Sequence, residues 1–144
     1  MANDAVLREV SLTLPMLPDM EIAASKTATA MAELMEMGSD RIDEVRMAIV
    51  EACVNAFEHS QASDRKVYVT FAVIGDTAPE KLQITIRDSG VGFKPEAVEE
   101  PRIEEKLRAK SKRGWGLKII KGLMDEVAIE SSSTGTSIVM SKYR

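Results

Sequence analysis

The segment EACVNAFEH, residues Glu51–His59, decides which fold this sequence predicts. It ends a stretch, residues 39–59, that contains neither Gly nor Pro and is therefore typical of a helix. Asn55 and Glu58 follow Glu51 at spacings of four and seven residues, so the three side chains project from one face of that helix, close to His59. Because polar faces on helices are common, this row by itself leaves a solvent-exposed face and a binding site equally open.

The sequence before this segment predicts a strand and a helix. Alternating apolar residues up to Leu14 predict an amphipathic edge strand that ends at two prolines. Residues 19–37 are rich in Ala, Met, Leu and Glu, which predicts a helix that ends at Gly38. Ser39 or Asp40 is expected to cap the next helix, which carries the segment EACVNAFEH.

The sequence after this segment predicts two hairpins with one helix between them. The alternating runs at residues 67–73 and 82–86 predict an antiparallel hairpin. Residues 94–113 contain few apolar side chains, with acids first and bases after, which favours a mobile loop. A helix is expected from residue 114 to about 124, and residues 127–131 and 136–142 predict a closing hairpin.

Length and composition exclude several classes of protein. The chain has 144 residues, 44% of them hydrophobic, which fits one soluble domain over residues 1–144. Its 19 basic and 23 acidic residues argue against a general nucleic-acid or membrane-surface binder. The single cysteine, Cys53, and single histidine, His59, exclude an internal disulfide framework and a multi-histidine metal site. With no apolar run of signal or membrane-span length, a cytoplasmic location is expected.

Two glycine-containing segments are candidates for ligand contact. Asp88-Ser89-Gly90-Val91-Gly92 places a carboxylate at the end of a predicted strand, where two glycines allow close approach of a ligand. An ordinary turn would use the same residue types. Arg113-Gly114-Trp115-Gly116-Leu117 opens a predicted helix, whose N-terminal N–H groups favour an anion such as phosphate. Gly135-Thr136, in the last hairpin, is the weakest of these signals because turn chemistry alone produces it.

The ordered set of these segments is more specific than any one of them. It resembles the Bergerat-fold (GHKL) ATP-binding domain shared by histidine kinases and type II topoisomerases. Four features look like the anti-sigma-factor serine-protein kinases of bacterial partner-switching systems. They are the residues of EACVNAFEH, the segment Leu123–Val127, the tail Thr136–Tyr143 and the short length. The resemblance implies an α+β fold, a two-layer α/β sandwich in which a mixed, largely antiparallel sheet is covered by about three helices.

The resemblance also implies roles for single residues at the phosphate end of a bound ATP. Asn55 would offer its side-chain oxygen to Mg²⁺, and Glu51 would act as general base toward an incoming hydroxyl. The phosphates would be contacted by backbone N–H groups of the helix opening, at Gly114, Gly116 and Leu117. Lys112 or Arg113 would be the side-chain partner. Trp115 would either cover the nucleotide or pack inward.

At the adenine end, the resemblance implies that Asp88 accepts a hydrogen bond from the adenine amino group. Gly90 and Gly92 would allow close approach of the base, and Thr136 would lie nearby. His59 would be a structural group rather than a phosphoacceptor.

The resemblance implies a serine/threonine protein kinase that acts as an anti-sigma factor. It would bind a sigma factor, phosphorylate an anti-anti-sigma (STAS-type) protein, and form a homodimer through the N-terminal strand and first helix. One alternative is a module that uses nucleotide only to gate partner affinity, and another is a detached histidine-kinase catalytic domain. A topoisomerase-like or chaperone-like ATPase is disfavoured, because 144 residues leave no room for a transducer domain.

Overall fold

The computed structural model describes residues 5–90 and 112–144, except the side chains of residues 112–114. The helices and strands in this part of the chain are, in order, β1 (Ala5–Pro15), α1 (Met20–Leu34), α2 (Ser39–His59), β2 (Lys66–Gly75), β3 (Pro79–Asp88), α4 (Lys112–Leu123), β4 (Glu126–Ser132) and β5 (Gly135–Tyr143). The predictions for Gly92, for a loop over residues 94–111 and for the side chains of Lys112 and Arg113 lie outside what the structure describes.

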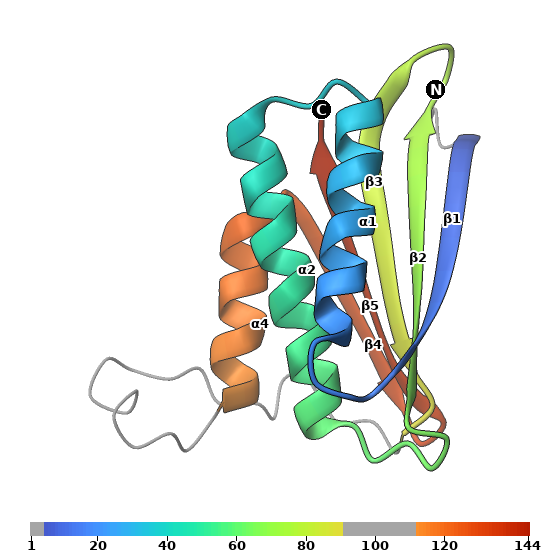
Figure 1. The fold of residues 1–144 in the computed structure, drawn as a ribbon, viewed down its shortest axis with the longest axis vertical. Coiled ribbons are helices and arrows are strands. Elements are labelled where there is room, and N and C mark those ends of the chain that lie inside the picture. The colour runs from blue at the N-terminus through green and yellow to red at the C-terminus, as the bar shows by residue number, and fades with distance from the viewer. Residues whose placement is uncertain (1–4, 91–111) are drawn as a thin grey trace.

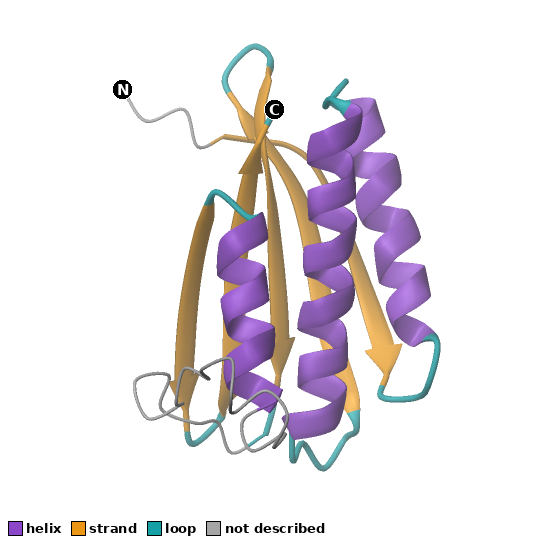
Figure 2. Ribbon diagram, turned by 90° about the vertical axis from the view of Figure 1, so that its left-hand side faces the viewer, coloured by secondary structure: helices purple, strands orange, loops and turns teal. Residues whose placement is uncertain are grey.

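The five strands form one sheet in the order β1-β2-β3-β5-β4, and α1, α2 and α4 cover one of its faces (Figure 1). Figure 2 shows the helix layer in front of the sheet. The predicted two-layer α+β fold is confirmed. The sheet is antiparallel in all four described pairings rather than mixed. Strand β4 runs parallel to β3, but the β4–β5 hairpin places β5 between them.

The core lies between the helix layer and the sheet. On α2, Val45, Ile49 and Cys53 are fully buried and follow one another at helical spacing. From the sheet, Phe71 of β2 and Ile84 of β3 belong to the same core. Burial raises the pKa of the Cys53 thiol to about 12, so this cysteine behaves as a small apolar side chain of the core.

The boundary between the first two helices differs from the prediction. Helix α1 ends at Leu34, and Glu36 adopts a left-handed backbone conformation with φ of 58°, a position at which helices usually place glycine. Gly38, predicted as the stop of α1, is instead the N-cap of α2. Neither Ser39 nor Asp40 caps α2, because both already lie inside it. Gly38 thus correctly predicts that the chain breaks between the two helices, but it does not predict the residue at which α1 ends.

Candidate active site

Three predicted site residues meet where α2 faces α4. Helices α2 and α4 run antiparallel (Figure 1), so the first turns of α4 lie beside the last turns of α2. A Cβ atom placed on Gly116 would lie 2.5 Å from Asn55 Nδ2 and 2.9 Å from Glu51 Oε1. Any side chain at position 116 would therefore displace both polar groups. Helix α4 begins at Lys112, two residues before the predicted start, so Gly116 lies in its second turn, and this turn abuts the polar row of EACVNAFEH.

The electrostatics at this contact fit proton transfer by Glu51. Burial raises the pKa of the Glu51 carboxyl, and the neighbouring Glu58 carboxylate raises it further. A carboxylate with a raised pKa accepts a proton more readily than one in water. Asn55 is 3% exposed, so its amide is held between the two helices. Glu58, predicted only as part of the polar row, therefore acts on the charge state of Glu51.

Glu51 also borders a cavity on the outer side of the helix layer. This cavity has a volume of about 410 Å³ and is lined by Ser25 of α1, by Arg46, Met47, Val50 and Glu51 of α2, and by Ile119 of α4. A group on a second molecule can approach Glu51 from this side without passing through the core.

The predicted adenine-binding residues form a second cluster, at the lower end of the sheet in Figure 1. Asp88 ends β3, is buried, and pairs across the sheet with the buried Thr136 of β5. Its Oδ1 accepts a hydrogen bond of 2.8 Å from the Gly90 N–H, an Asx turn that holds the carboxylate in place. Asp88 and Thr136 also line a cavity of about 410 Å³ at this end of the sheet.

Two glycines let the chain pass close to Asp88. Gly135 has φ of +144°, and a side chain there would overlap the Asp88 carbonyl oxygen. A Cβ on Gly90 would lie 3.0 Å from both Asp88 Oδ1 and Ser60 Oγ. Ser60, the residue that follows α2, therefore lies close to the adenine cluster.

Two serines that the sequence did not predict, Ser60 and Ser131, adjoin this cluster. Ser131 Oγ lies 3.1 Å from Thr136 Oγ1. The signal for Ser60 was its place directly after EACVNAFEH; the pairing of Ser131 with Thr136 follows from the strand register, which the sequence did not reveal.

Two further predicted residues lie near the two clusters. Trp115 is half-buried in the first turns of α4, with its indole Nε1 buried, and Lys118 Nζ is 6.0 Å from the centre of its ring. His59 Nε2 lies 4.0 Å from Glu58 Oε2 at the end of α2.

The residues present fit a nucleotide with Mg²⁺. At Gly116 the α4 backbone lies against α2 with no side chain of its own between it and the Asn55 amide, and Asn55 supplies an amide oxygen, which is a suitable Mg²⁺ ligand. Within residues 5–90 and 112–144, no group of three or more His, Cys, Asp or Glu side chains could hold a metal ion.

The model of the family described as "Histidine kinase-like ATPase domain" matches residues 14–142. The chain belongs to this family. Among curated members, a serine-protein kinase RsbW of Bacillus velezensis is 29% identical over 93% of this chain and 84% of its own length. An anti-sigma F factor of Bacillus cytotoxicus is 32% identical over 94% of this chain and 92% of its own length. Within the histidine kinase-like ATPases, the chain thus belongs with the anti-sigma-factor serine-protein kinases, as its motifs predict.

Solved structures support the histidine kinase-like ATPase fold. The RsbU and RsbW domains of Rv1364c from Mycobacterium tuberculosis match with a TM-score of 0.68 and 19% identity, over 95% of this chain and 33% of that one. The present chain thus spans about a third of that protein. A histidine kinase domain from Erythrobacter litoralis matches with a TM-score of 0.51 and 15% identity, over 97% of this chain and 70% of that one.

Proposed function

We propose that this chain is an ATP-dependent serine/threonine protein kinase that acts as an anti-sigma regulator and phosphorylates an anti-anti-sigma protein. The contact of Gly116 with Glu51 and Asn55 carries the proposal, because it joins a base and an amide ligand to the first two turns of α4. Phosphoryl transfer needs mainly positioning and charge neutralisation, which these groups can supply. The names of the relatives, a serine-protein kinase and an anti-sigma factor, support the same activity.

In this proposal the residues of the two clusters have separate roles. Asp88 accepts the hydrogen bond that selects adenine, and Thr136 lies beside it. The N–H groups in the first turn of α4, which have no acceptor within the helix, donate to phosphate oxygens, and Gly116 and Leu117 follow in the next turn. Asn55 holds Mg²⁺, which supplies positive charge to the phosphates when bound. Glu51 accepts the proton of the acceptor hydroxyl while the oxygen of that hydroxyl attacks the terminal phosphorus, and ADP leaves.

The proposed partners are a STAS-type anti-anti-sigma protein, a sigma factor and a second copy of the chain. Strand β1 supports the homodimer because it is an edge strand whose Val6, Leu7 and Val10 are exposed. We further propose a cytoplasmic location. Within the described residues, no helix is long and apolar enough to cross a membrane.

One experiment tests the activity. The purified chain is incubated with Mg²⁺, radiolabelled ATP and an anti-anti-sigma protein from the same genome. Label is expected on a serine or threonine of that protein and absent with GTP, whose base carries a carbonyl where adenine has its amino group. ATP binding without label transfer would contradict a kinase and favour a nucleotide-gated binding module.

The role of Asn55 is tested by Asn55→Ala. The variant is expected to lose the Mg²⁺-dependent part of ATP affinity, because alanine offers no oxygen ligand. Calorimetry with ATP, with and without Mg²⁺, measures this difference. An undiminished effect of Mg²⁺ would rule out Asn55 as the ligand.

A further inference from the structure

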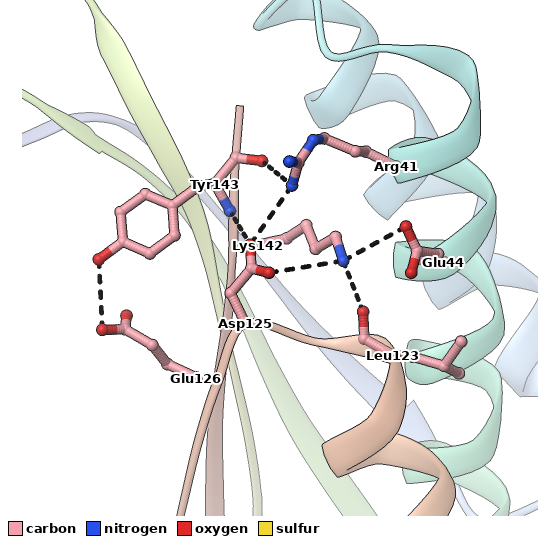
Figure 3. Close-up of polar contacts among 7 residues, drawn as sticks. All are labelled: Arg41, Glu44, Leu123, Asp125, Glu126, Lys142 and Tyr143. Carbon is pink, nitrogen blue, oxygen red and sulfur yellow. Dashed lines mark hydrogen bonds and ion pairs between the residues drawn. The ribbon is translucent and has the colours of Figure 1, made fainter.

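A cluster of charged side chains lies at the end of the helix layer opposite to the proposed nucleotide site (Figure 3). At its centre is Lys142 of β5, which is 4% exposed. Its Nζ donates a hydrogen bond of 2.7 Å to the carbonyl oxygen of Leu123, the last residue of α4. The same Nζ is 3.4 Å from Glu44 Oε1 of α2 and 3.7 Å from Asp125 Oδ1.

Asp125 extends the cluster to the start of α2 (Figure 3). Its Oδ2 accepts a 2.7 Å hydrogen bond from the Tyr143 N–H and lies 3.5 Å from Arg41 Nη1. Arg41 Nη1 also lies 3.3 Å from the Tyr143 carbonyl oxygen, to which it donates. Arg41 and Glu44 are three residues apart and therefore reach the cluster from one face of α2. The cluster thus joins the beginning of α2, the end of α4 and the end of β5.

Because Lys142 is buried, its ammonium group must keep these contacts at close distance. A buried ammonium group is tolerated only when charged and polar partners surround it, and here those partners belong to both helices. The Leu123 carbonyl is one of the last in α4 and has no donor within that helix, so Lys142 supplies it. Movement of α4 along α2 would separate Lys142 from Leu123 or from Glu44.

The spacing of contacts along the two helices links this cluster to the site. On α2, Glu44 precedes Glu51 by seven residues; on the antiparallel α4, Leu123 follows Gly116 by seven. Seven residues are about two helical turns, or roughly 10 Å. Because a helix is stiff over two turns, a displacement of α4 at Leu123 reaches Gly116 almost undiminished.

We infer that Lys142, together with Asp125, is a positioning residue for the nucleotide site. It sets the register of α4 against α2 and thereby places the backbone of Gly116 beside Asn55 and Glu51. Asp125 and Lys142 lie in Leu123–Val127 and Thr136–Tyr143, two segments that resemble the kinase family. The inference rests on the proposed nucleotide site.

The test compares Lys142→Met with Lys81→Met. Lys81 also forms an ion pair, 3.2 Å from Glu126 Oε1, and its side chain is 17% exposed, but it lies on the sheet face away from α4. Both variants are studied at a temperature at which thermal unfolding shows them folded. The first readout is the emission of Trp115, the single tryptophan, in nucleotide-free protein. The second is the dissociation constant for Mg²⁺-ATP, measured by calorimetry.

Lys142→Met is expected to shift the Trp115 emission and to weaken ATP binding about tenfold, a coupling of ordinary size for such a network. Lys81→Met is expected to keep the wild-type emission and a dissociation constant within about twofold of wild type, because it leaves the α4 contacts intact. Wild-type emission and affinity in Lys142→Met would overturn the positioning role. Failure of the wild-type chain to bind ATP would instead overturn the proposed function, while the Trp115 comparison would still decide whether Lys142 positions α4.

A milder pair decides the question if Lys142→Met does not fold. Glu44→Gln removes the charge that faces Lys142, whereas Asp43→Asn removes the neighbouring charge that pairs with Arg46 at 2.6 Å. Only Glu44→Gln is expected to increase hydrogen exchange in α4 and to weaken ATP binding, by about twofold to threefold. Equal behaviour of the two variants would overturn the inference.

Discussion

At the scale of single residues, the site depends on a glycine that has no room for a side chain. Gly116 faces the Asn55 amide and the Glu51 carboxylate, both of which have catalytic roles in the proposed function. Another glycine of the same helix, Gly122, has open space where a side chain would begin, with no atom within 4 Å of a Cβ placed there. Gly116 and Gly122 therefore differ in their surroundings although both are glycines within one helix.

Gly116→Ala is expected to weaken ATP binding by at least about tenfold, because the new methyl group displaces Asn55 and Glu51. Gly122→Ala serves as the control and is expected to keep ATP affinity while stabilising the fold by up to about 1 kcal/mol, through reduced backbone entropy of the unfolded chain. Calorimetry and urea unfolding measure the two effects. Equal ATP affinity in both variants would contradict the close contact at Gly116.

The raised pKa of Glu51 predicts the pH dependence of phosphoryl transfer. A base must be deprotonated, so the transfer rate should fall as the pH drops through the raised pKa of Glu51, above the usual value of a glutamate. Because the Glu58 carboxylate contributes to that increase, Glu58→Gln should move the falling limb to lower pH. Glu51→Gln should bind ATP but lose transfer. An unchanged profile in Glu58→Gln would show that Glu58 does not act on the base.

At the scale of secondary structure, the start of α2 is incompletely capped. Gly38 is its N-cap and makes no side-chain hydrogen bond to the first turn. Its φ of −65° and ψ of 151° suit any residue, and a Cβ there would meet nothing within 4 Å. The helix that carries Glu51 and Asn55 therefore begins with N–H groups that a side chain could satisfy.

Gly38→Ser is expected to increase the free energy of unfolding by about 0.5 kcal/mol, because serine accepts a hydrogen bond from the first turn and reduces the entropy of the unfolded chain. Urea denaturation measures the change, with Gly38→Ala as the control that adds a methyl group but no acceptor. Alanine matching serine would show that the cap hydrogen bond does not form.

At the scale of the whole molecule, the helix layer covers one sheet face and leaves β1 at an open edge. Strand β2 pairs with one side of β1, and within the described residues no strand pairs with the other side of β1. Such an edge, with exposed apolar residues, is suited to a second copy of the chain.

Val6→Lys is expected to convert the proposed homodimer to a monomer, because a charged side chain on an edge strand opposes strand pairing. The mass in solution, from light scattering at several concentrations, is the readout. Met47→Lys, at an exposed position of α2, is the control and should remain dimeric. A dimer in both variants would place the interface elsewhere, and a wild-type monomer would refute the homodimer.

The parts of this protein that depend on neighbouring residues in the chain could be predicted before the structure was known. Helical spacing put Glu51 and Asn55 on one face, strand alternation predicted both hairpins, and glycines marked the approaches to Asp88. The tertiary structure alone decided that Gly116 abuts Glu51 and Asn55 and that Lys142 bridges Glu44, Leu123 and Asp125. It also decided the purely antiparallel order of the described strands. Such contacts join segments tens of residues apart, and they form only when burial of the shared core fixes how the helices pack on the sheet.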